Sequence, residues 1–362
     1  MSAISTTLTA CPVLQADINA AWQAPNFTGG NDMMPLAEFL CSPLNKRNIA
    51  LQMTPGGGKI RDYKLTYTPR LLESATNSNV ANPYCSTGTV VGDLSTTYTL
   101  DTDVNYAAAH KSWSAGDLEA SCKDNSQYMA EVVAMQIDQL DRKVASVLTN
   151  QVAALYGTWG TDSALFTAGN SVGNVNTSDE FVVATLQSGG ILPDPRTWAL
   201  LRNAFEELGY ATPVIFDTGL LRNHFQTTAA GCCADSGIDL SATLAQYGYA
   251  VAYDRRLKGS SALNATDKAL ALIPGAAQVL NYTRAAWKSG MNVEQAGNYY
   301  HATIISPRLG LQYDWTLKDD CGTIVSAVVF TGKVIGMPDD MFTTGDDLAG
   351  VKGINKILVT NP

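Results

Sequence analysis

The sequence predicts an α+β fold in which one long helix acts as a spine for the strands around it. From Tyr128 to Leu155 apolar residues recur in steps of three and four, which is one stripe at the helical period. About a hundred residues with almost no helical pattern precede this helix, and short alternating runs typical of strands follow it. The stripe consists of Met129, Val133, Ile137, Leu140, Val144, Leu148, Val152 and Leu155.

Composition limits the class of protein. The chain has 362 residues, of which 46 % are hydrophobic, so two domains plus extensions are expected. No apolar run approaches the roughly 18–20 residues that span a bilayer, and the first residues lack the basic and apolar blocks of a signal peptide. We therefore expect a cytosolic protein. A net charge of −9, from 24 Lys and Arg against 33 Asp and Glu, excludes strong nucleic-acid binding over most of the surface.

The seven cysteines are expected to be reduced and mostly buried thiols. Their number is odd, they are widely spread, and their spacing does not match a set of metal ligands. Cys232 and Cys233, with His224 nearby, could ligate a metal, but adjacent cysteines rarely both face one ion, so we favour a structural role. The cysteines are Cys11, Cys41, Cys85, Cys122, Cys232, Cys233 and Cys321.

The residues before the long helix predict an arm and a β-ribbon. Residues 1–47 are polar, with one weak helical patch at Pro35–Leu40, and we expect a partner to hold them in place. Residues 48–110 alternate like extended hairpins, with strands on either side of Pro55–Gly58 and a second pair near Thr97–Leu100 and Val104–Ala108. A long two-stranded ribbon is marginally stable alone, so this one is expected to lie on another surface.

The residues after the long helix predict a compact α/β domain between about 191 and 295. Asp194 and Pro195 open a helix as N-cap and first helical residue. Its apolar stripe is Trp198, Leu201, Phe205 and Leu208. The other elements expected here are strands at Thr212–Phe216, Gly248–Tyr253 and Ala269–Ile273, a helix at Leu220–Gln226 and, just before the domain, a short helix or strand at Phe181–Leu186.

The last segment returns to strands. Alternating runs predict an antiparallel sheet, and such a sheet would need the long helix to cover one of its faces. The predicted strands are Tyr299–Ser306, Leu311–Trp315, Ile324–Phe330 and Lys333–Met337.

The sequence contains little that indicates catalysis. Gly56-Gly-Gly-Lys59 lacks the first glycine and the Ser or Thr of a phosphate-binding loop, so it is interpreted as a hairpin turn. His110, His224 and His301 are far apart and are interpreted as structural residues. The pairs Asp319–Asp320 and Asp339–Asp340 are expected in solvated turns. The basic groups at Asp254–Arg256 and Pro307–Arg308 are expected to contact another subunit rather than phosphate. We predict no catalytic, cofactor-binding or metal-binding residue.

This order of elements resembles the major capsid proteins of tailed bacteriophages, which have the Hong Kong phage-type capsid fold that encapsulins share. The pieces most similar to the family are Gln127–Asn150 as the spine, Leu192-Pro-Asp-Pro-Arg-Thr-Trp198 at the start of the apical helix, and Ser306–Asp314 with Lys318–Cys321 near the end. The resemblance implies a non-enzymatic protein that needs no cofactor.

The resemblance implies a division of the chain into parts. Residues 1–47 would be an N-terminal arm along a neighbour, and residues 48–112 an extended loop over the adjacent subunit. Residues 113–190 and 296–345 would form the peripheral domain around the spine. Residues 191–295 would form the axial domain, and residues 346–362 a C-terminal extension.

The resemblance also implies partners and a location. Copies of the chain would assemble into hexamers and pentamers of an icosahedral head, in the host cytoplasm. The head would enclose double-stranded DNA without sequence-specific binding, with no membrane and possible scaffolding, portal and decoration proteins. Deletion of residues 70–95 should leave a soluble chain that makes no shells.

The chain departs from some relatives. It shows no long, charged, helical scaffolding segment near its start, so a separate scaffolding protein or none is expected. Lys59, Lys64 and Asn361 are of the types that cross-link in some relatives, but no motif supports that chemistry here. The alternatives are an encapsulin shell, another virion structural protein, and a hydrolase built on residues 191–295 with His224 in its active site.

Overall fold

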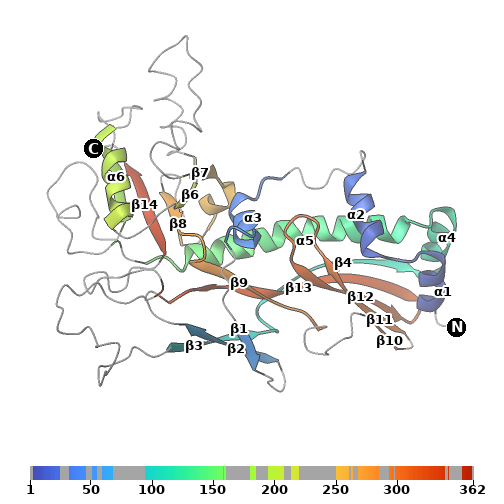
Figure 1. Ribbon diagram of the computed structural model, residues 1–362. Helices are drawn as coiled ribbons and strands as arrows, with labels where there is room; N and C mark the ends of the chain where they lie inside the picture. Colours follow the sequence, from blue (N-terminus) through green and yellow to red (C-terminus); the bar gives the residue numbers. More distant parts are fainter. Residues whose placement is uncertain are drawn as a thin grey trace, which may run out of the picture.

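The structure is a computed structural model. Its long helix α5, Tyr128–Ala153, runs through the middle of an elongated molecule, and the N-terminus lies near one end (Figure 1). The residues that the structure describes are 3–24, 32–45, 51–54, 59–67, 94–157, 159, 180–184, 195–207, 213–219, 250–260, 262–263, 268–284, 293–296, 298–338, 341 and 353–360.

Helix α5 confirms the predicted spine. The predicted stripe is buried from Met129 to Val152, and Leu155 packs partly buried beyond the end of the helix. The N-cap residue Gln127 makes no side-chain cap. Asn125 instead accepts a hydrogen bond from the Gln127 backbone at 2.9 Å. Most of the helix's stability therefore comes from burial of one face, since capping contributes little at its start.

Among the described residues before α5 there are four helices, so the prediction of an almost helix-free segment is wrong. They are α1 (Ala3–Ala10), α2 (Gln15–Gln23), α3 (Pro35–Cys41) and α4 (Ala115–Asp124). Only α3, which starts with Pro35, was predicted. Helices α2 and α3 pack on α5, while α1 packs on α4. These helices are short and carry weak apolar stripes, so tertiary packing stabilises what local sequence does not signal.

The largest sheet is antiparallel and lies under α5. Its strand order is β10-β11-β12-β13-β4, and β9 pairs with a further stretch of β13. Contacts of α5 with β13 and β4 confirm that the spine covers this sheet. The strands are β4 (Tyr106–Ser114), β9 (Ala277–Tyr282), β10 (Val293–Ala296), β11 (Tyr299–Ile305), β12 (Gln312–Asp320) and β13 (Thr323–Gly336).

Strand β13 is continuous where two strands were predicted. Gly332 lies at the predicted break, and a Cβ there would stand 2.3 Å from the Leu280 carbonyl oxygen of β9. Glycine thus permits close approach of β9 without interrupting β13. Asp319 and Asp320 end β12, and the turn that follows is Cys321–Gly322, both with positive φ.

A three-stranded sheet of order β1-β2-β3 lies on the side of β9 and β13 away from α5 (Figure 1). Its strands are β1 (Leu51–Thr54), β2 (Ile60–Tyr67) and β3 (Leu94–Asp101). The antiparallel pairing of β1 with β2 confirms the predicted hairpin. Its inward face buries Tyr63, Leu65 and Leu100, and the Tyr98 hydroxyl donates to the Gly336 carbonyl at 2.9 Å.

The predicted ribbon is therefore corrected in one respect. Strand β4 does not pair with β3 but joins the large sheet beside β13. The described base of the ribbon lies on the body of the chain, with Arg61 over the Tyr282 ring at 5.3 Å. The predicted polar tip, Asn77–Thr89, lies outside the described residues.

The third sheet is mixed, with the order β5-β14-β8-β6-β7. The predicted strands at 212–216, 248–253 and 269–273 are confirmed, the ambiguous segment near Phe181 is a strand, and α6 confirms the helix that begins at Pro195. The elements are β5 (Glu180–Ala184), α6 (Pro195–Glu207), β6 (Val214–Asp217), β7 (Ala250–Tyr253), α9 (Arg255–Lys258), β8 (Lys268–Leu272) and β14 (Ile354–Thr360). The predicted cap Asp194 and the predicted helix 220–226 lie outside the described residues.

Two of the sheets join strands from different parts of the predicted division of the chain. Strand β14, expected in a C-terminal extension, pairs with both β5 and β8 inside the mixed sheet. Strands β9 and β10, expected in the 191–295 unit, belong to the large sheet instead. Local pattern identifies strands but not the sheet that each one joins.

The expectation of reduced thiols is wrong for one pair. Cys11 and Cys122 form a disulfide with their Cα atoms 5.5 Å apart. They are 111 residues apart in the sequence, so spacing gave no sign that the fold brings them together. Cys41 and Cys321 are thiols, and Cys85, Cys232 and Cys233 lie outside the described residues.

Candidate functional site

The two described histidines occupy different settings. His110 is exposed on β4, whereas His301 is buried on β11 with its Nε2 2.8 Å from Asp314 Oδ1. The Arg284 backbone N–H donates to the same carboxylate at 3.1 Å, and the Arg284 guanidinium donates to the Tyr299 hydroxyl at 3.0 Å. This arrangement is a mutually satisfied polar cluster on a sheet. His224, the residue of the hydrolase alternative, lies outside the described residues.

Two further observations concern the described part of the chain. There, no group of three or more His, Cys, Asp or Glu side chains is placed to hold a metal ion. Among the helices described, none is long and apolar enough to cross a membrane.

Both basic groups predicted as subunit contacts bind the chain's own N-terminal arm, here meaning the described residues 3–24 and 32–45. Arg255 and Arg256 form ion pairs with Asp32 at 2.9 and 2.5 Å, and Arg256 also donates to the Met33 carbonyl at 2.7 Å. Arg308 forms an ion pair with Glu38 at 2.6 Å. These arginines thus contact α3 and the residues before it, within the same chain.

Asp254 connects the arm to the mixed sheet. Its Oδ1 accepts from the Arg256 backbone at 2.9 Å as N-cap of α9, and its Oδ2 accepts from the Leu36 backbone at 3.2 Å. The side chain is buried, so each carboxylate oxygen replaces water with a fixed donor. Asp254, the residue that follows β7, therefore positions the start of α3.

Amide side chains hold the arm at two other places. The Gln15 side chain donates to the Ile305 carbonyl at 3.0 Å and accepts from the Ile305 backbone N–H at 2.8 Å. Asn45, fully buried, donates to the Leu40 and Ala277 carbonyls and accepts from the Gly275 backbone. Each of these amide side chains both donates and accepts hydrogen bonds at one position. Together they fix the register of the arm along the body of the chain.

A buried carboxylate joins the spine to the large sheet. Asp141 of α5 accepts from the Tyr313 hydroxyl at 2.5 Å and from the Ser306 hydroxyl at 2.8 Å. Burial raises the pKa of Asp141 to about 7, opposed by these two bonds and by Arg308, while Asp138 raises it further. Burial and Asp141 together raise the pKa of Tyr313 well above its usual value.

A neutral network lies along the same helix. The Trp315 indole donates to Ser326 at 2.9 Å, and the Ser326 hydroxyl donates to Gln136 at 2.8 Å. Gln136 donates in turn to the Ser326 carbonyl at 3.1 Å. All three side chains are buried, so their complete pairing fixes α5 against β12 and β13.

A third buried cluster joins the end of the spine to the mixed sheet. Glu180 of β5 pairs with Lys268 at 2.6 Å and with Lys356 at 3.3 Å. Lys356 also lies over the Tyr156 ring at 3.7 Å, just beyond the spine. The Trp159 indole donates to the Lys356 carbonyl at 2.6 Å, so the chain leaving α5 is bound to β14.

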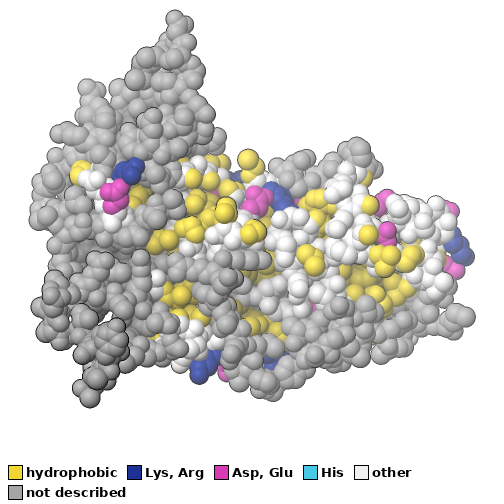
Figure 2. All heavy atoms as spheres, viewed as in Figure 1, with side chains coloured by type: hydrophobic (Ala, Val, Ile, Leu, Met, Phe, Trp, Pro, Cys, Tyr) yellow, Lys and Arg dark blue, Asp and Glu magenta, His cyan; other side chains and the backbone are white. Residues whose placement is uncertain are grey.

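The surface of the described residues carries many apolar side chains. Figure 2 shows hydrophobic side chains over much of the described surface beside α3 and α5, with charged groups few and scattered. The exposed large hydrophobic residues are Leu14, Met33, Leu44, Ile60, Leu94, Val104, Tyr106, Met135, Tyr253 and Ile305. Three of them lie on the arm (Leu14, Met33 and Leu44), two on the ribbon strands (Ile60 and Leu94) and one on the spine (Met135).

Sequence reasoning did not find these contacts. It identified Arg255, Arg256 and Arg308 as notable but not their acidic partners, since Asp32 and Glu38 are more than 200 residues away. A signal for Asp141 does exist: an acidic residue directly beside the apolar stripe of a long helix is unusual.

No protein-family model matches the chain, and no curated protein matches it. Solved structures are similar to it over most of its length. The capsid asymmetric unit of cyanophage A-1(L) is 13 % identical, covers 93 % of this chain and 96 % of that chain, and has a TM-score of 0.47. The mature capsid of bacteriophage PhiM1 is 13 % identical, with coverages of 83 % and 82 % and a TM-score of 0.41. The capsid of Ralstonia phage GP4 is 12 % identical, with 85 % of each chain covered and a TM-score of 0.38. Because all three TM-scores lie below 0.5, we base the function on the geometry of this chain.

Proposed function

We propose that this chain is the major capsid protein of a tailed bacteriophage. Copies of it assemble into hexamers and pentamers that form an icosahedral head around double-stranded DNA. The observation that carries the proposal is the layering around α5: arm helices on one side, an antiparallel sheet on the other, and a hairpin sheet beneath that (Figure 1). Along the sequence, the arm, ribbon, spine helix, α/β domain and returning sheet follow one another in the order that resembles the Hong Kong phage-type fold.

The parts then receive the following roles. Residues 1–47 are the arm and residues 48–112 the extended loop. The peripheral domain consists of residues 113–190 and 296–345, and the C-terminal extension of residues 346–362. The axial domain consists of residues 191–295, from which β9 and β10 reach into the large sheet. Strand β14 of residues 346–362 pairs with β8 in the mixed sheet, so it supports the axial domain rather than extending away from it.

The physical basis of assembly is burial shared between chains. An elongated subunit with apolar side chains exposed on arm, spine and ribbon gains stability when copies cover them. Closed symmetry repeats each modest contact many times. The net charge of −9 suits a wall that DNA slides past without adhering.

The proposal includes a location and partners but no catalysis. The protein assembles in the host cytoplasm and resides in the virion, where scaffolding, portal and decoration proteins are candidate partners. A structural role is supported by the buried ionisable groups, because each of them is hydrogen-bonded or ion-paired to neighbouring side chains. Asp141 is bound by Tyr313 and Ser306, His301 by Asp314, and Glu180 by two lysines.

The test is negative-stain electron microscopy of the protein expressed alone, with its mass measured by light scattering. Shells, tubes or hexamer rings are the expected result. A monomer of 38.5 kDa that also fails to assemble with candidate scaffolding proteins would contradict the proposal. Packaged DNA in particles from infected cells would distinguish a phage head from an encapsulin, which would hold an enzyme.

A loop deletion tests the assignment of the extended loop. Replacement of residues 70–93 by a short Gly-Ser linker leaves β3 intact and should give soluble protein that makes no shells. A Ser insertion at the exposed turn after Asp320 is the control and should assemble normally. Normal shells from the loop deletion would refute the assignment of residues 48–112.

A further inference from the structure

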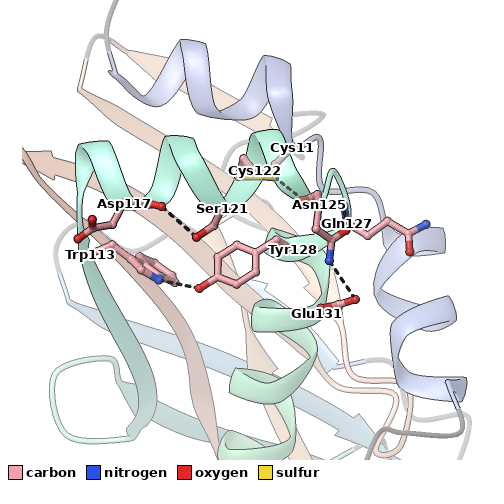
Figure 3. The surroundings of a disulfide bond; sticks show 9 residues. All are labelled: Cys11, Trp113, Asp117, Ser121, Cys122, Asn125, Gln127, Tyr128 and Glu131. Atoms are coloured by element: carbon pink, nitrogen blue, oxygen red, sulfur yellow. Dashed lines mark hydrogen bonds between the residues drawn. A yellow bond between two sulfur atoms is a disulfide. The ribbon is translucent and has the colours of Figure 1, made fainter.

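We propose that Cys11 and Cys122 form a redox-controlled latch that locks the N-terminal arm onto its own subunit. Cys11 follows the last residue of α1, and Cys122 lies in the last turn of α4. The disulfide between them joins the two helices side by side (Figure 3). Within the described residues, this disulfide cross-links the start of the arm to the body of the chain.

The site accommodates the reduced state as well. Cys11 Sγ lies 3.5 Å from the Asn125 carbonyl oxygen, within reach of a bond from a thiol S–H (Figure 3). Asn125 also accepts from Gln127 at the start of the spine. Reduction would therefore leave Cys11 with an acceptor in place, and α1 could stay docked without the covalent bond.

Burial makes the latch depend on movement of the arm. Cys11 is 0 % exposed and Cys122 is 2 % exposed, so a small-molecule thiol or disulfide reaches neither sulfur while α1 is docked. Exchange must occur when α1 lifts from α4. The disulfide thus forms or is reduced only while α1 is undocked from α4.

The oxidant that we assign is a low-molecular-weight disulfide. The thiolate of one cysteine attacks it, forms a mixed disulfide and releases one thiol. The thiolate of the other cysteine then displaces the second thiol and forms the Cys11–Cys122 bond. The two protein thiols lose two electrons and two protons, and the small disulfide becomes two thiols.

The consequence rests on the proposed function. Cytoplasm keeps thiols reduced, so during assembly only non-covalent contacts would hold the arm, among them Gln15 to Ile305 and Glu38 to Arg308. Outside the cell the bond would form and fix the arm where it docked. The arm can therefore adjust during assembly and becomes fixed in the released particle.

The first test detects the bond. The full chain is purified with dithiothreitol, incubated with oxidised glutathione, alkylated, denatured and digested with trypsin. Since the chain has no Lys or Arg before Lys46, Cys11 lies in peptide 1–46 and Cys122 in peptide 112–123. We expect these two peptides to be linked, and still linked in Cys41→Ser, which removes the other cysteine of peptide 1–46. Folded protein without this link after oxidation would overturn the proposal.

The second test measures the arm by hydrogen exchange of residues 3–10. We expect exchange at least tenfold slower in oxidised than in reduced protein, and redox-independent in Cys11→Ser and Cys122→Ser. Cys321→Ser, which removes an exposed thiol, should behave like the unaltered chain. Equal exchange in oxidised and reduced unaltered protein would overturn the latch. Both tests read a single subunit, so failure to form shells would refute the proposed function without deciding the latch.

Discussion

The Tyr313 hydroxyl donates a 2.5 Å hydrogen bond to Asp141 and thereby joins the large sheet to the spine through a buried carboxyl group. Neither side chain is exposed. The same carboxyl accepts from Ser306, whose hydroxyl oxygen also accepts from the backbone of Arg308, the arginine that binds the arm. Spine, sheet and arm therefore meet at one ionisable group.

This group predicts a pH-dependent stability. The pKa of Asp141 is about 7 in the folded chain, against the usual 3.8 of an aspartate, so between these values the folded chain holds more protons than the unfolded chain. The Asp141 contribution to unfolding free energy should fall as pH rises from about 4 to 7, by at most about 1.4 kcal/mol per pH unit. Asp141→Asn should remove that slope. Urea unfolding at several pH values measures it, with exposed Asp320→Asn as control; identical slopes in Asp141→Asn and the unaltered chain would contradict the prediction.

The buried face of the spine predicts a large loss of stability when one of its side chains is truncated. Leu140 is fully buried on α5, and Leu140→Ala should lower the free energy of unfolding by about 2–5 kcal/mol because it leaves a cavity. Met135, on the same helix, is 55 % exposed, so Met135→Ala should change it by less than about 0.5 kcal/mol. Urea denaturation compares the two. Similar losses at both positions would show that the predicted faces of α5 are wrong.

The contact of β9 with β13 predicts that Gly332 does not tolerate a side chain. A Cβ there would lie 2.3 Å from the Leu280 carbonyl and 2.6 Å from a Phe330 ring atom. Gly332→Ala should therefore cost about 1–3 kcal/mol in unfolding free energy. Gly116→Ala in α4 meets nothing within 4 Å and should be neutral or slightly stabilising. Thermal unfolding of both variants provides the measurement, and a Gly332→Ala protein as stable as the control would refute the close approach.

The arm contacts predict local loosening when one arginine is removed. Arg308→Met keeps the aliphatic stem but removes the ion pair with Glu38, so α3 should open more readily by roughly 1–3 kcal/mol. Hydrogen exchange of residues 35–41 measures this. Lys123→Met breaks the exposed ion pair with Glu119 and serves as the control, because such pairs contribute little. Unchanged exchange in Arg308→Met would mean that other contacts alone hold α3.

Part of the fold could be predicted because its signal is local. The spine repeats its apolar residues over seven turns, and β6, β7 and β8 are short apolar runs between turn residues. Helices α1, α2 and α4 were missed because each is ten residues or fewer and carries a weak stripe. Short helices of this kind form only where a surface receives them.

The candidate site was predicted less well, for the same reason. The arginines after β7 and β11 were noted as unusual, but their partners in the arm are more than 200 residues distant. The disulfide joins cysteines that were expected to be reduced. No spacing rule relates residues so far apart, since their proximity depends on how the arm docks.

The sequence by itself determined the long helix, most of the strands and the hairpin of β1 and β2, because periodicity and turn residues act over a few neighbours. Only the tertiary structure decided that β4 joins β13, that β14 enters the mixed sheet between β5 and β8, and that the arm lies on its own spine. These choices depend on which strand edges and apolar faces remain uncovered once the other elements have packed, and that is a property of the whole chain.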